Sequence, residues 1–477
     1  NILIGLVRTK VLAILLGPAG VGLVGLYRGL VDTGSTVANM GLNIVGTRQI
    51  AEADAREDDR ALAVARRAIF WAAIVLACTG GLVMWSFRRL LAERVLGNAT
   101  HAGIVGWLSL GVAFAVGAAS QGALIQGMRR IGDIARVTVY GAIANTVVGI
   151  ALIWRWGYAG LVFYVLVMPV ASFLLGWLYV SRLPKVADHD ISLPEMTEQW
   201  KMLLRLGIPF MGAALATPLI LLWIRIDVSN VLGTEALGQF QASWTISTQY
   251  IALVLGAMAA DYYPRLTGVM QDHAAATRLV NEQTEIALLL SAPIFLAMMG
   301  LAPWVLRVLY TADFAPAVVI LRWQVLSDVL KVAAWPLGFV ILAAGDGRNF
   351  FLSETSSLLI MGVLIAGLLR TFGLEMTGIA YLACYIFLLP LVYWLAKSRI
   401  GFAWSRSVVR LLAVAFVVCA GVGLVASTTQ WGALVGCVAS VAFGIHAVGR
   451  LSHMSDLGGS AGRIGDMARR LTAGFGK

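Results

Sequence analysis

The stretch AIFWAAIVLACTGGLVMWSF, residues 68–87, contains no charged side chain and is long enough to cross a lipid bilayer as one helix. A transmembrane helix needs about 20 consecutive apolar residues, because the hydrocarbon core is about 30 Å thick and each residue adds about 1.5 Å. Strands of a membrane barrel instead alternate apolar and polar residues over about ten positions. The stretch therefore predicts a membrane-spanning helix.

Further apolar windows of similar length follow one another along the chain. They lie at 1–16, 22–44, 103–126, 134–154, 157–180, 202–224, 236–262, 284–310, 318–344, 354–370, 376–396, 408–427 and 430–448. Together with residues 68–87 they predict an all-α polytopic membrane protein with about 14 transmembrane helices and short loops.

The composition supports the same class of protein. Hydrophobic residues make up 59% of the chain and charged residues 13%, whereas a soluble domain has about 25% charged residues. A soluble enzyme is therefore excluded. The formal net charge of +11 does not indicate nucleic-acid binding, because the positive residues collect in the loops between apolar segments. The four cysteines lie in apolar segments without CxxC spacing, which is typical of packing residues rather than disulfides or a zinc site.

A weak internal repeat divides the chain into two halves. Shifting the sequence by 216 positions aligns Gly17 with Gly233 and Trp107 with Trp323, which occupy equivalent predicted helices of two six-helix blocks. Repeated bundles around a central cavity are common in transporters, and an even helix number places the pseudo-twofold axis along the membrane normal. The predicted organisation is an N-terminal lobe at 1–183, a cytoplasmic linker at 184–201, a C-terminal lobe at 202–398, two further helices at 399–450 and a cytoplasmic tail at 451–477.

Loop charges predict the orientation. One set of alternate loops, together with the C-terminal tail, carries roughly four times as many lysines and arginines as the other set. The positive-inside rule places that set, and both termini, in the cytoplasm. Within it, Gln49 to Arg67 interleaves apolar and charged residues, and we expect an amphipathic helix along the cytoplasmic surface.

Charged residues inside the apolar segments are the candidate functional residues, because an ionised group at membrane depth needs a partner, a wet cavity or a function. Among those in or at the ends of the segments, we single out Arg8, Lys10, Arg28, Asp32, Arg322, Asp328 and Lys331. The spacings of Arg28 with Asp32 and of Asp328 with Lys331 are equally consistent with structural ion pairs on one helical face. Arg8 and Lys10 have no acid in their own helix, so the segments keep an excess of positive charge. The pattern favours a hydrated, net-basic cavity that attracts an anion.

Catalytic motifs are lacking in the sequence. It contains no HExxH and no P-loop, and the loops leave no extramembrane domain for a nucleotide site. We therefore expect a transporter rather than an enzyme, with no catalytic residue, cofactor or metal.

Two runs carry a resemblance to a known family. They are LGPAGVGLVGLYRGL at 16–30 and the run from Phe314 to Glu354, which contains RWQVLSDVLKV at 322–332. Both resemble the Wzx flippases, the lipid-linked oligosaccharide translocases that include the O-antigen and enterobacterial common antigen lipid III flippases. The similarity extends over about residues 1–400. It implies the multidrug/oligosaccharidyl-lipid/polysaccharide exporter fold, with two six-helix lobes around a central cavity.

The resemblance also implies a function. An undecaprenyl-diphosphate-linked sugar repeat unit would move from the cytoplasmic to the periplasmic leaflet of a Gram-negative inner membrane by alternating access, for surface polysaccharide synthesis. A polysaccharide polymerase and a chain-length regulator are implied as partners. We expect the cations Arg8, Lys10, Arg28, Arg322 and Lys331 to hold the diphosphate and acidic sugars. Asp32 and Asp328 are candidates for proton coupling.

Alternatives from the same superfamily remain open. The two helices after residue 400 depart from the twelve-helix pattern of Wzx flippases and are similar to those of fourteen-helix lipid II flippases. A cation-coupled multidrug exporter is a second alternative, although the excess of arginine and lysine argues against it. A membrane glycan polymerase is disfavoured because the longest predicted periplasmic loop, near 88–102, has only about 15 residues.

Overall fold

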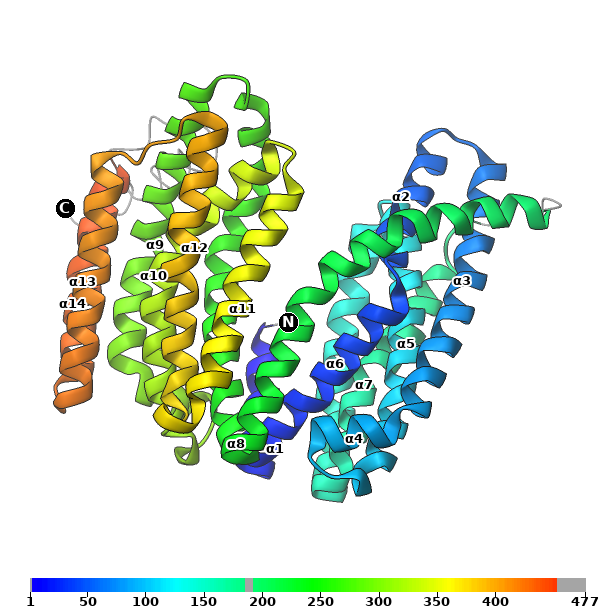
Figure 1. The fold of residues 1–477 in the computed structure, drawn as a ribbon, viewed down its shortest axis with the longest axis horizontal. Coiled ribbons are helices and arrows are strands. Elements are labelled where there is room, and N and C mark those ends of the chain that lie inside the picture. The colour runs from blue at the N-terminus through cyan, green and yellow to red at the C-terminus, as the bar shows by residue number, and fades with distance from the viewer. Residues whose placement is uncertain (1, 185–191, 453–477) are drawn as a thin grey trace, which may run out of the picture. The chain divides into compact units, whose positions relative to one another are not determined.

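The computed structural model describes residues 2–184 and 192–452, and within them the chain is helical with no strand (Figure 1). Eleven stretches are long and apolar enough to span a membrane, and three of these, Ile4–Asn39, Ile131–Val180 and Leu193–Gly256, each hold two apolar helices. Divided at the break in α1, between α6 and α7 and at the break in α8, these stretches give fourteen apolar helical segments within the described residues. The prediction of an all-α polytopic protein is confirmed.

The long helices have the following bounds. They are α1 (Ile2–Asn39), α2 (Leu42–Ala55), α3 (Asp59–Ser86), α4 (Arg88–Leu96), α5 (Ala102–Gly127), α6 (Ile131–Trp156), α7 (Gly160–Val180), α8 (Leu193–Val269), α9 (His273–Leu309), α10 (Ala317–Ala343), α11 (Gly347–Phe372), α12 (Glu375–Ile400), α13 (Arg406–Thr428) and α14 (Gly432–Ser452). Three short 3₁₀ helices, Ala99–His101, Gly157–Ala159 and Ala312–Phe314, lie in the connections.

Helices α1 and α8 are each broken at one glycine. Gly17 has φ 62° and ψ −167°, and Gly233 has φ 88° and ψ 171°. A positive φ with an extended ψ is accessible almost only to glycine. These two residues are the pair aligned by the 216-residue shift, so the same backbone break occurs at equivalent positions of the proposed repeat and supports it.

Unit 1 of the structure extends from the N-terminus to Gly238 and therefore includes the first part of α8. This part of α8 packs tightly on α1: a Cβ on Gly207 would lie 2.1 Å from the carbonyl oxygen of Met40, and one on Gly238 would lie 1.9 Å from that of Pro18. The division between the units thus falls inside α8 rather than in the connection before it. The lobe boundaries given by the sequence, 1–183 and 202–398, stay a prediction, and residues 185–191 and 453–477 of the predicted linker and tail lie outside the described residues.

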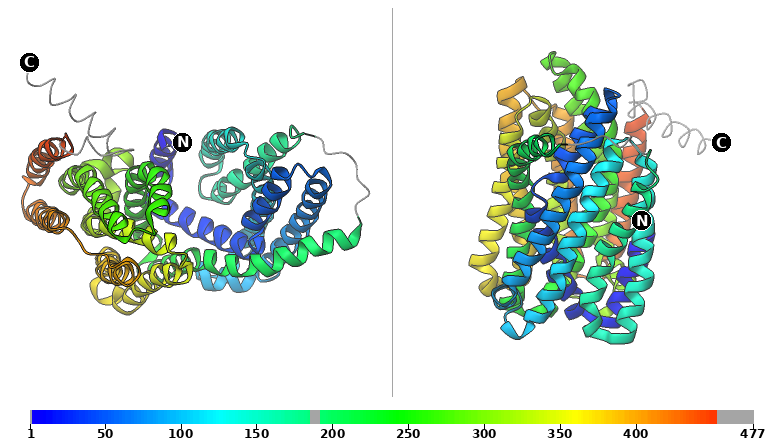
Figure 2. Two further views of the ribbon diagram at one scale, coloured as in Figure 1. Left: turned by 90° about the horizontal axis from the view of Figure 1, so that it is seen from above. Right: turned by 90° about the vertical axis from the view of Figure 1, so that its right-hand side faces the viewer.

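Unit 2 begins at Gln239 and is built around α10. Its core includes Tyr262 of α8, Leu337 of α10, Leu388 of α12 and Phe402, all with at most 2% of their surface exposed. The hairpin of α13 and α14 packs on α9 (Figure 2). There the backbones approach closely, since a Cβ on Gly436 would lie 2.7 Å from the Cα of Gly300.

The prediction of one surface helix over Gln49–Arg67 is wrong. Helix α2 ends at Ala55, and Asp58 then caps a new helix by accepting a hydrogen bond from the backbone nitrogen of Ala61 at 2.9 Å. Helix α3 continues unbroken from Asp59 to Ser86. Residues 59–67 are therefore the polar first turns of a membrane-spanning helix, because a cap followed by a long apolar run favours one continuous helix over two.

Aspartates also begin two helices of unit 2. The side chain of Asp272 accepts from the backbone nitrogens of Ala274 and Ala275, each at 3.0 Å, and starts α9. Asp346 accepts from Asn349 and starts α11. Because hydrogen bonds to the ionised carboxylate stabilise it, they hold the pKa of Asp272 and the pKa of Asp346 below the ordinary value.

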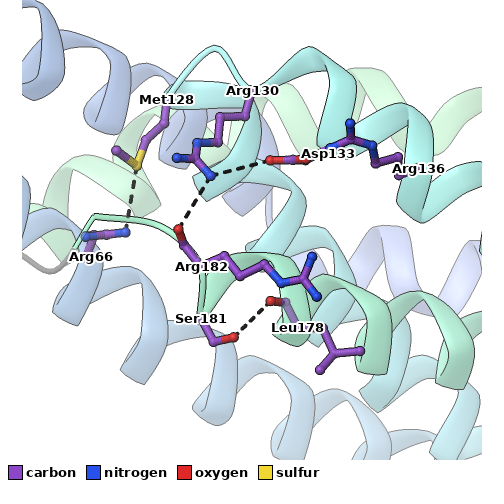
Figure 3. A network of polar contacts seen from close by, with 8 residues as sticks. All are labelled: Arg66, Met128, Arg130, Asp133, Arg136, Leu178, Ser181 and Arg182. Atoms are coloured by element: carbon purple, nitrogen blue, oxygen red, sulfur yellow. Dashed lines mark hydrogen bonds and ion pairs between the residues drawn. The ribbon is translucent and has the colours of Figure 1, made fainter.

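One end of unit 1 is rich in arginine (Figure 3). Arg66 of α3 donates to the carbonyl oxygen of Pro184 at 2.8 Å, and Arg130 donates to that of Arg182 at 3.5 Å. Asp133 lies 2.8 Å from Arg136 and 3.6 Å from Arg130, and arginines outnumber the acids here even when Asp58 and Asp59 at the start of α3 are included. This end of α3, α5, α6 and α7 is therefore strongly positive, in accord with the loop charges.

Candidate functional site

A polar cavity of about 290 Å³ lies within unit 1, between α1, α6 and α7. Charged and amide side chains line it together with apolar ones. The lining residues are Arg8, Arg28, Val31, Asp32, Asn145, Val165, Met168 and Pro169. Three of the charged residues singled out by the sequence, Arg8, Arg28 and Asp32, thus meet at one cavity among apolar helices.

Two neutral residues hold the arginines in place. Arg28 donates from Nη2 to the hydroxyl oxygen of Tyr164 at 2.9 Å. Asn145 is fully buried. When its side-chain nitrogen donates to the carbonyl oxygen of Tyr164 at 3.2 Å, its side-chain oxygen accepts a hydrogen bond from Nη1 of Arg8 at 2.9 Å. Tyr164 and Asn145 therefore fix the two guanidinium groups on the α6–α7 side of the cavity.

Arg225 of α8 joins this group and was not among the predicted site residues. It lies near enough to interact electrostatically with Asp32 and with Arg28. Its Nε is buried and has no hydrogen-bond partner among residues 2–184 and 192–452. The apolar window ends at residue 224, whereas α8 continues to its break at Gly233. Arg225 therefore lies inside the span rather than at its end.

The balance of charge in this cluster is positive. Arg28 makes no direct ion pair with Asp32 in the part of the chain that the structure describes. Three arginines, Arg8, Arg28 and Arg225, therefore share one carboxylate that remains exposed. A buried guanidinium without a full set of acceptors can bind an anion strongly, because its donors form bidentate hydrogen bonds with phosphate oxygens.

Lys10 does not line this cavity. Lys10 lies two positions after Arg8. Because a helix turns about 100° per residue, the two side chains leave α1 about 200° apart. Sequence proximity therefore brings Arg8, but not Lys10, to the site.

A second polar cluster is centred on Asp328 of α10 in unit 2. Asp328 is fully buried. Its carboxylate accepts hydrogen bonds from the hydroxyls of Ser247 at 2.8 Å and Tyr381 at 3.3 Å, and also from Tyr250. These partners come from α8 and α12, so three helices converge on one carboxylate.

Lys331 is joined to Asp328 through a tyrosine. Its Nζ donates to the hydroxyl oxygen of Tyr381 at 3.1 Å, and that hydroxyl in turn donates to Asp328. The ammonium also lies 5.8 Å from the ring centre of Tyr381 and 5.7 Å from that of Tyr385, a cation–π arrangement. The carboxylate and the ammonium therefore compensate each other inside an aromatic shell.

The Asp328 cluster keeps some unused hydrogen-bonding capacity. Gln324, one turn before Asp328, is fully buried, and neither atom of its amide has a partner among the described residues. No group of three or more His, Cys, Asp or Glu side chains that could hold a metal ion occurs in residues 2–184 and 192–452.

Arg322 lies apart from the Asp328 cluster within unit 2. It lines a groove of about 390 Å³ between α9, α10, α12 and α13 and donates from Nε to the carbonyl oxygen of Met299 at 3.4 Å. Nine residues separate Arg322 from Lys331, which is two and a half helical turns, so the two cations leave opposite faces of α10. Within unit 1, Arg8 and Arg28 line one cavity. That the five cations hold one substrate together stays a prediction.

Comparison with known proteins agrees with this architecture. The family described as polysaccharide biosynthesis protein matches residues 11–319, more than half of the chain. The chain belongs to this family. The relatives of this family member include the lipid III flippase of Escherichia coli (strain K12), which is 21% identical over 415 residues covering 84% of this chain and 95% of the relative. The lipid III flippase of Shigella flexneri matches with the same values.

Solved structures show the fold of this family member. An inward-facing multidrug resistance MATE family transporter of the MOP superfamily matches with a TM-score of 0.70 and 16% identity, covering 84% of this chain and 94% of the transporter. The lipid II flippase MurJ in an inward closed conformation matches with a TM-score of 0.63 and 13% identity, covering 90% and 97%. The resemblance to the exporter fold is thereby confirmed, and the chain is a multi-pass membrane protein.

Proposed function

We propose that the chain is a flippase that moves undecaprenyl-diphosphate-linked oligosaccharide repeat units across the bacterial inner membrane, from the cytoplasmic to the periplasmic leaflet, for surface polysaccharide synthesis. The observation that carries this proposal is the net-positive cavity among the apolar helices of unit 1. The membership of the polysaccharide biosynthesis family and the lipid III flippase relatives support it.

In this proposal the diphosphate binds to Arg8, Arg28 and Arg225. Guanidinium groups suit a diphosphate because they form bidentate hydrogen bonds and stay charged at all physiological pH values. Tyr164 and Asn145 position two of these groups before the substrate arrives, which lowers the entropic cost of binding. The polyprenyl chain stays in the lipid phase, since transferring it to a polar cavity would lose hydrophobic stabilisation.

Asp32 sets how tightly the anion is held. Its carboxylate faces the same cavity and interacts electrostatically with Arg28 and Arg225. A negative group competes with the diphosphate for these arginines, so it weakens binding and favours release. We assign it the role of a release group. Proton coupling through Asp32 or Asp328 stays a prediction of the sequence.

The orientation follows from the arginine-rich end of unit 1. We place that end, and both termini, in the cytoplasm, because positive loops are retained on the cytoplasmic side. Reporters fused to the C-terminus test this: a fluorescent protein should be active there, and alkaline phosphatase should be inactive. Polysaccharide polymerase and chain-length regulator are the partners we expect in the membrane, and co-purification tests that contact.

Transport by proteoliposomes tests the proposed function. Full-length protein is reconstituted with a polyprenyl-diphosphate-linked oligosaccharide, and movement between leaflets is followed by access of an impermeant glycan-modifying enzyme. We expect flipping by the wild-type protein and a loss of at least about tenfold in Arg28→Gln, the effect of removing one charged hydrogen bond. Arg48→Gln is the control, because Arg48 is exposed and its ion pair is with Glu52, one turn further along α2.

The rival functions are tested in the same vesicles. Lipid II and a cationic drug replace the oligosaccharide lipid in parallel reactions. Faster transport of either one, or full flipping by a well-folded Arg28→Gln protein, would contradict the proposal. Size-exclusion profiles of all variants show whether each remains folded.

A further inference from the structure

Another groove of unit 2 shares no lining residue with the Asp328 cluster and has no part in the proposed transport step. It has a volume of about 740 Å³. Helix α9 forms its floor, and α13 and α14 form its walls. The lining residues are Glu285, Leu289, Arg406, Ser407, Arg410, Leu411, Val414, Val418, Ala439, Ala442, Phe443, His446 and Arg450.

The hairpin closes this groove at one end. At the turn between α13 and α14, a Cβ on Gly432 would lie 2.4 Å from the Cα of Ala426, so the two helices touch there. Helix α14 is held to the floor by a hydrogen bond from Ser440 to the carbonyl oxygen of Pro293 at 2.8 Å. The opposite end, where α13 begins and α14 ends, is open between the arginines.

The open end carries more positive than negative charge. Glu285, only 8% exposed, accepts from Nε of Arg450 at 2.8 Å and from the hydroxyl of Ser407 at 3.0 Å. Arg406 and Arg410 are exposed, and neither has a side-chain hydrogen bond or ion pair with any residue in 2–184 or 192–452. One buried carboxylate thus compensates one of three arginines and leaves two unpaired cations at the rim.

Below this rim the groove is apolar. Val418 lies eight residues after Arg410 in α13, about 12 Å further along the helix. The α13 side chains that line this part of the groove are Leu411, Val414 and Val418. Cations above an apolar channel match a molecule with an anionic head and hydrocarbon chains. A water-soluble anion would gain nothing from these walls, and a lipid without net charge would leave the surplus positive charge of the rim uncompensated.

From this match of charge and polarity we propose that the groove binds an anionic diacyl phospholipid, such as phosphatidylglycerol. Its phosphate contacts Arg406 and Arg410, and the upper part of its acyl chains lies along α13 and α14. The bound lipid fills the space between the hairpin and α9, and so stabilises the attachment of α13 and α14 to unit 2.

Native mass spectrometry of the full-length protein, delipidated in detergent, tests the proposal. The probes are phosphatidylglycerol, phosphatidylethanolamine and undecaprenyl diphosphate. We expect the affinity for phosphatidylglycerol to exceed that for phosphatidylethanolamine by about tenfold or more, because two arginines attract an anionic headgroup. Equal binding of the two phospholipids, or a preference for undecaprenyl diphosphate, would overturn it.

Three variants locate the site. Arg406→Gln/Arg410→Gln should abolish the preference for phosphatidylglycerol, whereas Arg129→Gln/Arg182→Gln, which removes the same charge from the arginine-rich end of unit 1, should keep it. Val414→Trp preserves every charge but fills the groove, and it should weaken binding by a similar factor. If Val414→Trp binds as the wild type does, the arginines act only as a surface charge and the proposed groove is wrong. Unfolding temperatures without lipid show that the variants remain folded.

Discussion

The two units of this protein differ in how they hold charge, although the sequence shift that relates the two halves also relates a backbone break. The break at Gly17 of α1 has its equivalent at Gly233 of α8, in the part of that helix that belongs to unit 1. The charged residues have no such equivalents: with the same shift of 216 positions, Arg28 aligns with Trp244, and Asp328 aligns with Val112. The backbone geometry is therefore repeated, whereas each unit carries its own polar cluster.

The difference between the clusters lies in compensation. In unit 1, three arginines share one exposed carboxylate at a cavity. In unit 2, the fully buried Asp328 accepts three hydroxyl hydrogen bonds and is linked to Lys331 through Tyr381. An uncompensated, accessible group is available to a ligand, while a compensated, buried group stabilises the packing around it. We therefore expect substitutions in unit 1 to affect transport and those in unit 2 to affect stability.

The largest expected effect is on stability, in Asp328→Ala. This change leaves the three hydroxyl groups around Asp328 without their acceptor and Lys331 without its compensating charge. Removal of one member of a buried charged pair costs about 3–5 kcal/mol. The free energy of unfolding in mixed micelles measures it. Asp32→Ala, at an exposed carboxylate, should change the unfolding free energy far less. Equal losses in the two variants would remove the distinction between the clusters.

The next effect is on transport, in Gly29→Ala. A Cβ at this position would lie 2.8 Å from Nη1 of Arg225, and the flexible arginine should move away from the cavity. We expect flipping to fall by about tenfold, the loss of one charged hydrogen bond, while every charge is retained. Gly5→Ala is the matched control in the same helix, because nothing lies within 4 Å of its Cβ position. Normal flipping in Gly29→Ala would argue against a role for Arg225.

A smaller effect on stability is expected in Tyr381→Phe. The ring stays in place beside Lys331, but the hydroxyl that joins Lys331 to Asp328 is lost. We expect a loss of about 1–3 kcal/mol in unfolding free energy, since one buried donor loses its partner. The free energy of unfolding of this variant is measured together with that of Asp328→Ala. A loss as large as that of Asp328→Ala would mean that the Tyr381 hydroxyl alone accounts for the stabilisation that the cluster provides.

The smallest effect is expected in Arg322→Gln. Arg322 lies in a separate groove on the face of α10 opposite Lys331, so flipping should stay within about twofold of wild type, as is typical of substitutions outside a site. Transport by this variant in the vesicles that test Arg28→Gln measures it. If Arg322→Gln lost as much transport as Arg28→Gln, the two arginines would act on the same substrate.

Much of the fold could be predicted from the chain alone. Apolar windows such as 68–87 identify spanning helices, because the bilayer sets their length and polarity. The surface helix over 49–67 was predicted wrongly, since the cap at Asp58 joins the charged residues 59–67 to the apolar helix that follows. Helix ends depend on such local hydrogen bonds, which an average over an apolar window does not detect.

Less of the candidate site could be predicted. The cost of charge inside an apolar segment made Arg8, Arg28, Asp32 and Asp328 recognisable. It did not distinguish Arg8 from Lys10, although the 100° turn per residue could have done so. Arg225 was missed because α8 extends further than its apolar window. The neutral partners Tyr164 and Asn145 carry no signal of their own among many similar residues.

The amino-acid sequence of this protein was sufficient for its class, its spanning segments and its surplus of positive charge, because these depend on the composition of single helices in a lipid solvent. Which charges meet, which are buried with partners and where a groove opens depended on packing. Helices far apart in the chain supply each cluster, as α1, α6, α7 and α8 do in unit 1. Contacts of that kind arise from the shapes of many side chains together and cannot be read from any one segment.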